Sequence, residues 1–278
     1  MEISQIRTAK IRKKKENKRN ITLMIGLILV AFLLFMMVMG LLFSPYDVAQ
    51  MNKKEKFMAP CLTHLMGTDN FGRDIFTRVQ QGMGMTVLIA ISVTGIGAFF
   101  GTILGAITGY YGGWLDEILM RLNDMLAAFP SILLALVFIS ILGSGKYIII
   151  LALGIIFIPS YARIVRGEFL RLRESDYIKS AKLMGVSDFR IMLVHILPNG
   201  IPALLSALTV GFNNAVLAEA GMSYLGIGVQ PPDASLGQML SEAQGYLFSA
   251  PWYALCPGVI IILLILGFSF ISEGIAGR

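Results

Sequence analysis

The sequence predicts an all-α membrane protein with six transmembrane helices, and three observations support this fold class. The chain has 278 residues, of which 56% are hydrophobic and 14% are charged, whereas a soluble domain carries about 25% charged residues. Its mean hydropathy is +0.73. Six windows are apolar over roughly the 20 residues that a helix needs to cross a bilayer. This composition excludes an ordinary soluble enzyme, a disordered chain and a nucleic-acid-binding protein.

The six apolar windows follow one another along the chain. They are Ile21–Phe43, Thr86–Tyr111, Leu122–Leu142, Tyr147–Ala162, Ile201–Ala218 and Tyr253–Ser272. The first is longer than the apolar region of a signal peptide, which has about 7–15 residues, so it is predicted to be a retained helix. The fourth is short and is expected to continue as a helix beyond the lipid. Pro130 and Pro159 interrupt backbone hydrogen bonding and predict kinks in the third and fourth helices.

The basic residues predict the topology. Most of the 23 Lys and Arg residues fall in the first twenty positions and in 163–199, and six spans place both stretches on one side. By the positive-inside rule both termini are cytoplasmic. The net charge of +6 then reflects topology rather than a polyanionic partner. The expected divisions are a basic tail (1–20), the first transmembrane helix (21–43), an outer loop (44–85) and a five-helix core (86–278) containing the cytoplasmic loop 163–199.

The predicted spans are nearly free of ionisable groups, Asp124 in the third being the exception. Ion-coupled carriers usually need such groups near the membrane midplane, so we expect an energy source outside this chain, although coupling through the carbonyls of broken helices stays open. The second span contains glycines at four-residue spacing, which favours close packing of another helix over contact with a ligand. These glycines are Gly97, Gly101, Gly105 and Gly109.

Two outer segments have patterns of their own. Thr68 is a suitable N-cap for a helix over 69–81, with apolar residues on one face and charged ones, including Arg73 and Arg78, on the other. This pattern fits a helix that lies in the outer membrane interface. We interpret it as a connector, and an element at the rim of the translocation path is the less favoured alternative. The loop Glu219–Trp252 is long, and helical spacing within it predicts a segment that packs on the bundle.

The cytoplasmic loop 163–199 is predicted to form two short helices joined by a glycine elbow. Ser175 caps the first helix, which ends at Gly185. Asp188 starts the second, and Pro198 is expected to stop it. A basic loop alone is explained by topology, but a capped and glycine-broken helix pair is not. We therefore interpret the loop as a docking element for a cytosolic partner.

Three motifs resemble bacterial binding-protein-dependent ABC importers. Lys179-Ser180-Ala181, Gly185 and His195-Ile196-Leu197-Pro198 resemble the family's cytoplasmic loop motif, with Lys179 in place of Glu and Ser180 in place of Ala. His195 stands for Ile, as in the peptide/nickel branch. The segments 67–74 and 223–232 are similar to outer motifs of that branch, and the chain resembles its C subunit. The first of these segments includes Gly67, Thr68, Asp69, Gly72, Arg73 and Asp74.

The resemblance implies a type I ABC importer permease fold in the bacterial cytoplasmic (inner) membrane. It also implies a second permease subunit, two cytosolic ATPases that use ATP and Mg, and an extracytoplasmic substrate-binding protein, with no nucleic acid. The chain itself is expected to be no enzyme and to hold no cofactor, metal or catalytic residue. A coupling helix over 177–188 would seat in an ATPase groove, where Ala181 and Gly185 allow close approach. The predicted coupling residues are Tyr177, Lys179, Ser180, Ala181, Gly185, Asp188, His195 and Pro198.

Several alternatives remain at this point. Di- and oligopeptides are the favoured substrates, and nickel or a metal chelate is the alternative. A stand-alone carrier or channel, or a structural scaffold, is less favoured because neither explains the cytoplasmic loop. Gly143-Ser144-Gly145-Lys146 lacks the remaining residues of a phosphate-binding loop and is read as a hairpin. The two histidines, His64 and His195, are expected on opposite sides of the membrane, which argues against an intramembrane hydrolase.

Overall fold

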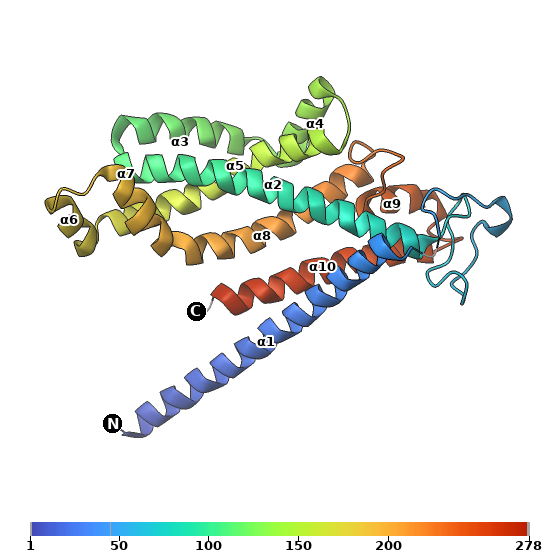
Figure 1. Ribbon diagram of the computed structural model, residues 1–278, viewed down its shortest axis with the longest axis horizontal. Helices are drawn as coiled ribbons and strands as arrows, with labels where there is room; N and C mark the ends of the chain where they lie inside the picture. The colour runs from blue at the N-terminus through green and yellow to red at the C-terminus, as the bar shows by residue number, and fades with distance from the viewer. Residues whose placement is uncertain (1, 45, 277–278) are drawn as a thin grey trace.

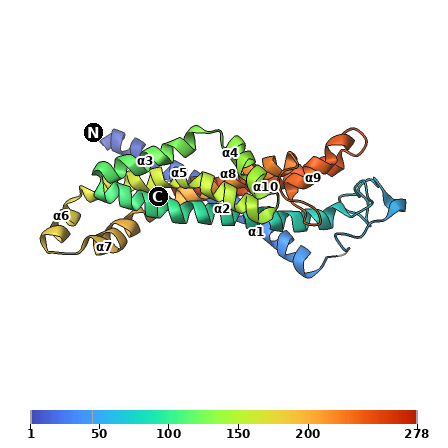
Figure 2. The ribbon, with the colours of Figure 1, turned by 90° about the horizontal axis from the view of Figure 1, so that it is seen from above.

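The computed structural model describes residues 2–44 and 46–276, and these form a long bundle of helices (Figure 1). Met1, Pro45, Gly277 and Arg278, which belong to the predicted tail, outer loop and core, lie outside the described residues. The α-helices are α1 (Glu2–Leu42), α2 (Ile75–Tyr111), α3 (Gly113–Ala128), α4 (Ser131–Leu142), α5 (Lys146–Arg173), α6 (Asp176–Leu183), α7 (Asp188–Arg190), α8 (Leu197–Tyr224), α9 (Leu236–Ala243) and α10 (Trp252–Ala276). Both views place α6, α7 and the two chain ends toward one end of the bundle, and α9 toward the other (Figures 1 and 2).

Five helices of the described chain are long and apolar enough to span a membrane, or six if the bent pair α3 and α4 counts as one span. The third predicted span is not one continuous helix, because α3 and α4 meet at 89°. Phe129 between them has extended backbone angles (φ −84°, ψ 138°). Pro130 explains the break, since a proline disfavours helical geometry in the residue before it.

Helices α2 and α5 pack with their backbones in close contact. A Cβ atom added to Gly101 would lie 2.6 Å from the Cβ of Tyr161, and one added to Gly105 would lie 2.5 Å from the carbonyl oxygen of Ala162. Gly97 and Gly109 face α5 in the same way, at Phe157 and Phe169. The four glycines therefore form a continuous strip of bare backbone against which α5 lies.

Two expected helix boundaries are wrong. Helix α2 begins at Ile75 and runs unbroken to Tyr111, so there is no separate interfacial helix over 69–81. Its N-cap is Asp74, whose carboxylate accepts a hydrogen bond of 2.8 Å from the amide of Thr77. Thr68 instead accepts a hydrogen bond from the amide of Met58. Both residues are good caps in sequence, and only the fold of the preceding loop selects Asp74.

The second wrong boundary is the predicted stop at Pro198. The helix continues from Asp188 to Tyr224 through a π-helical turn, Ile191–Ile196. The amide of Leu197 donates to the carbonyl of Met192, five residues earlier. Pro198 then lies in the first turn of α8, where a missing amide hydrogen is tolerated. The wider turn thus absorbs the disruption that the proline causes.

Helix α1 lies beside α10 (Figure 1) and contacts the rest of the bundle little. Glycines allow the close approach, because a Cβ on Gly26 would lie 2.9 Å from the carbonyl oxygen of Gly267. The predicted tail does not form a separate structural element, since α1 runs as one helix from Glu2 to Leu42. Its apolar part, Asn20–Gly40, is the candidate span.

Candidate functional site

The loop between α5 and α8 folds as an elbow, residues 175–190, at the end of the molecule. Ser175 is the N-cap of α6, and Gly185 follows its end with φ +78°, a conformation that favours glycine. The amide of Val186 donates to the carbonyl of Ala181 (3.1 Å), and that of Gly185 donates to Lys182 (3.0 Å). These two bonds define a Schellman motif. The sequence therefore predicts the glycine elbow correctly, although the last residue of α6 is Leu183, two residues before Gly185.

The inner face of the elbow packs on the chain itself. Ile178 is fully buried and Ala181 is 4% exposed, in a cluster with Tyr110, Phe169 and Ile196. Ala181 is therefore not on the outer surface, although the sequence interpretation assigned it to close contact with a partner. Helical spacing alone did not distinguish the inner face from the outer one.

Three apolar residues of the elbow, Leu183, Met184 and Phe189, are exposed and are called here the apolar tip. Their exposed fractions are 89%, 77% and 68%. Lys179, Ser180, Tyr177 and Gly185 are also exposed. Sequence reasoning missed Leu183 and Phe189, and the available signal was apolar residues on both sides of a glycine turn in an otherwise polar loop.

Polar contacts fix the elbow to the end of α2. The hydroxyl of Tyr110 donates to Asp188 (2.5 Å), and the ammonium of Lys182 lies 4.8 Å from the centre of the Tyr110 ring. The Arg173 guanidinium donates to the Tyr110 carbonyl (3.0 Å). His195 contributes its carbonyl, which accepts from the side-chain amide of Asn199 and is 3.4 Å from the Tyr177 hydroxyl. Movement of the elbow must therefore act on α2, α5 and α8 together.

The opposite end of the molecule holds a cluster of four charged residues and one tyrosine, the Arg78 cluster, made up of Asp69, Arg73, Arg78, Glu242 and Tyr253. The Asp69 carboxylate accepts from Arg73 (2.6 Å) and from Arg78 (2.7 Å), and the Glu242 carboxylate accepts from Arg78 (2.8 Å) and Tyr253 (2.7 Å). Asp69 is fully buried and Arg78 is 2% exposed. The expectation that these charges line the polar face of an interfacial helix is wrong.

Two glycines shape the loop that carries this cluster. Gly67 and Gly72 both have φ +75°. A Cβ on Gly72 would lie 1.9 Å from the carbonyl oxygen of Asn52, and one on Gly67 would lie 2.5 Å from that of Met58. The Asp74 carboxylate also accepts a hydrogen bond from the buried ring of His64 (2.9 Å). The segment 67–74 thus forms a tight turn that directs charged side chains toward α9 and α10.

The balance of burial and charge sets the protonation of Glu242. Burial of its carboxyl raises the pKa, but hydrogen bonds and the positive charge of Arg78 outweigh this effect and hold the pKa of Glu242 below its usual value. The carboxylate is therefore ionised at neutral pH and joins α9 to α2.

Glu219 is a second buried carboxyl group. The predicted fifth span ends at Ala218, but α8 continues to Tyr224 and includes Glu219, which is fully buried. Hydroxyl groups of Thr86 (3.0 Å) and Ser223 (2.7 Å) donate to it. The predicted window 201–218 contains no ionisable residue, but the helix is longer than this window and includes one directly after it. Helix α9 packs beside this site, as the loop pattern predicts, and the Leu236 amide contacts Thr86.

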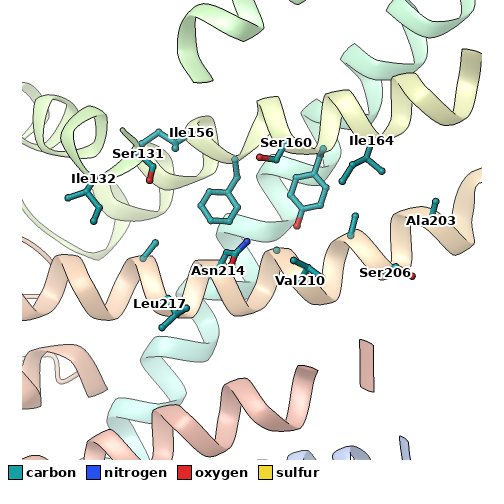
Figure 3. A pocket seen from close by; sticks show the side chains of 15 residues that line it. Ser131, Ile132, Ile156, Ser160, Ile164, Ala203, Ser206, Val210, Asn214 and Leu217 are labelled. Carbon is teal, nitrogen blue, oxygen red and sulfur yellow. The ribbon is translucent and has the colours of Figure 1, made fainter. Parts of the chain in front are cut away.

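A groove of about 710 Å³ lies between α5 and α8, with the start of α4 at one side (Figure 3). None of the 15 lining residues is charged. Most are apolar, and the polar ones include Ser131, Ser160, Ser206 and Asn214. Sequence reasoning did not find this groove, because its walls come from segments far apart in the chain. Within the described chain, no group of three His, Cys, Asp or Glu side chains is placed to hold a metal ion.

Comparisons with known proteins agree with this architecture. Residues 101–278 match the family described as "binding-protein-dependent transport system inner membrane component". The chain is 38% identical over 262 residues to the dipeptide transport system permease protein of Alkalihalophilus pseudofirmus, covering 94% of this chain and 86% of that protein. It is 38% identical over 232 residues to the glutathione transport system permease protein of Pectobacterium atrosepticum, covering 83% and 77%.

Among solved structures, the inward-facing MetNI methionine ABC transporter is similar in fold. The TM-score is 0.61 at 20% sequence identity, with 72% of this chain and 95% of the other chain covered. At this identity the likeness supports the fold of the helical bundle.

Proposed function

The chain belongs to the family of binding-protein-dependent transport system inner membrane components, and from this premise we propose that it is the permease subunit of an ATP-driven importer of di- and oligopeptides. The names of its relatives support this substrate class, since they refer to dipeptide, peptide and glutathione transport. These names favour peptides over nickel or a metal chelate.

The proposed complex contains this chain, a second permease, two cytosolic ATPases and an extracytoplasmic binding protein. The ATPases use ATP and Mg, and this chain carries out no chemistry of its own. It lies in the bacterial cytoplasmic membrane with both termini inside. The distribution of Lys and Arg residues supports this orientation by the positive-inside rule. The elbow then faces the cytosol and the Arg78 cluster faces outward.

The apolar tip of the elbow is the observation that carries the coupling proposal. Leu183, Met184 and Phe189 are largely exposed, and apolar groups gain about 25 cal/mol per Å² when they leave water. The tip inserts into a groove of an ATPase subunit, while Ile178 and Ala181 anchor the elbow to this chain. Closure of the ATPases then moves α2, α5 and α8 through the same anchor.

Replacing Leu183 with Glu in the complete complex tests this coupling. The side chain is 89% exposed, so folding and insertion should be unaffected, while a charge at the interface should reduce peptide transport and substrate-stimulated ATP hydrolysis at least tenfold. The matched control is Leu62→Glu, an exposed leucine in the loop between α1 and α2 at the opposite end of the molecule (98% exposed).

Normal transport and ATP hydrolysis in Leu183→Glu would show that the tip does not couple the subunits. Ala181→Glu is a poorer test, because Ala181 is buried and a charge there disrupts this chain's own packing.

A further inference from the structure

Two adjacent asparagines on α8 have opposite surroundings. Asn213 is 9% exposed, and its side-chain amide donates to the Ser269 hydroxyl on α10 (2.9 Å). Asn214 is exposed, lines the groove between α5 and α8, and has no hydrogen-bond partner among the described residues. Successive helical residues point about 100° apart, so one asparagine holds the bundle together and the other faces the groove (Figure 3).

The unpaired amide of Asn214 is informative because of its depth. It lies within the continuous helix Asp188–Tyr224, ten residues or about 15 Å from the outer end. Ser160, across the groove, lies near the middle of α5, and its exposed hydroxyl also has no hydrogen-bond partner in the part of the chain that the structure describes. An unsatisfied polar group is unfavourable in hydrocarbon, so this face requires water, a polar ligand or a polar group of another subunit in place of lipid.

Other hydroxyl groups on α8 are satisfied within their own helix. Ser206 donates to the carbonyl of Pro202 (3.1 Å), and Thr209 donates to that of Leu205 (2.9 Å). Such internal bonds make a hydroxyl compatible with a lipid surface. The Asn214 amide makes no such bond, which distinguishes the groove from a face adapted only to lipid.

The floor of the groove supplies a second, independent observation. Tyr161 is 2% exposed and lines the groove, and its hydroxyl makes no hydrogen bond of normal geometry to any described residue. It lies against Gly211 of α8, where an added Cβ would be 1.8 Å from the phenolic oxygen. A buried hydroxyl, which has only the Thr94 hydroxyl as a polar neighbour among the described residues and no hydrogen bond of normal geometry, therefore borders the same space as Asn214 and Ser160.

We propose that Asn214 and Ser160 bind the main chain of a peptide as it passes between α5 and α8. A primary amide presents a donor and an acceptor in one plane, which matches a peptide group, and the serine hydroxyl both donates and accepts. The volume of about 710 Å³ falls within the usual range of about 300–1,000 Å³ for small-ligand sites. Because the walls of the groove are uncharged, they do not discriminate between peptides by the charge of their side chains. Recognition in the groove therefore rests on the main-chain groups of the peptide. The proposal rests on the function proposed above.

The first experiment measures uptake of labelled Ala-Ala by the complete complex in proteoliposomes. Asn214→Leu should lower the transport rate at saturating binding protein five- to tenfold, while ATP hydrolysis stimulated by the loaded binding protein stays within twofold. Asn214→Gln, which keeps the amide, should recover part of the loss. The control Ser92→Ala removes a hydroxyl on α2 that bonds to its own helix and should transport normally.

The second experiment places a cysteine at the site. Asn214→Cys in a background with Cys61→Ser and Cys256→Ser should react with a small, membrane-impermeant thiosulfonate during turnover, and Ala-Ala with its binding protein should slow the reaction severalfold. Phe99→Cys, on an apolar face of α2 that is 62% exposed, should remain unmodified.

Normal uptake by Asn214→Leu, or an unreactive cysteine at 214, would overturn the proposal and leave the peptide-import function intact. Failure of the unaltered complex to take up Ala-Ala, with uptake of labelled nickel instead, would overturn the function itself, and the inference with it.

Discussion

Replacing Asp69 with Asn tests whether the Arg78 cluster stabilises the outer end of the bundle. One carboxylate oxygen of Asp69 accepts amide hydrogens from Phe71 (2.8 Å) and Arg73 (2.9 Å), and the other accepts from the guanidinium groups of Arg73 and Arg78. An asparagine keeps the first pair of bonds but turns an NH₂ group toward two cations. The variant therefore separates the shape of the turn from its charge.

The expected cost follows from burial. Asp69 is fully buried and Arg78 is 2% exposed, and removing one partner of a buried ion pair costs about 3–5 kcal/mol. Glu242 still neutralises part of the remaining charge, so we expect about 3 kcal/mol. At roughly 2–4 °C per kcal/mol for a chain of this order of size, the unfolding midpoint should fall by about 6–12 °C.

Tryptophan fluorescence in detergent provides the assay. The chain has two tryptophans, and Trp252 lies next to the cluster, with its indole nitrogen 3.5 Å from the Thr68 carbonyl. A Trp114→Phe background leaves Trp252 as the only reporter. Asp47→Asn, an exposed outer-loop change, should shift the midpoint by less than about 1 °C, since exposed charges contribute little. An unchanged midpoint in Asp69→Asn would refute the buried-charge argument.

Three further predictions concern packing, pH and topology. Gly105→Ala should destabilise the bundle by about 1–3 kcal/mol, because the added Cβ would lie 2.5 Å from a carbonyl oxygen of α5. The control Gly95→Ala should not destabilise it, since no atom lies within 4 Å of the added Cβ. Thermal unfolding of the two variants provides the comparison. The contribution of Glu242 to stability should be complete above its unfolded pKa of about 4.3 and lost as pH falls below it, because its folded pKa is lowered; a midpoint constant down to pH 3 would contradict this. Cys61 should react with an impermeant maleimide in intact cells faster than Cys256. Its thiol is exposed, and a hydrogen bond with a neighbouring threonine lowers the pKa of that thiol. Labelling of Cys61 only after lysis would contradict its outer location.

Local patterns predicted those features whose causes are local. Apolar windows located the long helices because a membrane span must bury about 20 residues. Ser175 and Gly185 marked the ends of α6, although only Gly185 acts by the expected mechanism, since the Ser175 hydroxyl donates to the Leu172 carbonyl and does not cap the helix. Glycine spacing on α2 similarly indicated a packing face, although only the structure identifies α5 as its partner.

Other features depend on residues far apart in the chain. Arg78 and Glu242 are separated by 164 positions, and Thr86 and Glu219 by 133. A sequence pattern shows each of these as an isolated charge or hydroxyl, and the usual expectation is then an exposed position. Pro198 failed as a helix stop for a different reason, since a π-helical turn offered a way to continue that no local preference indicates.

Polar residues inside the spans separate into three kinds once their partners are known. Glu219 and Asn213 join helices to one another, so they contribute to the fold. Ser206 bonds to its own helix and is compatible with lipid. Asn214 and Ser160 belong to neither kind, and both line the groove between α5 and α8. Asn213 and Asn214 are adjacent and of the same residue type, yet they belong to different kinds. Residue identity alone therefore does not locate a transport path. Polar groups that lack a hydrogen-bond partner therefore mark the space between α5 and α8 as the candidate path.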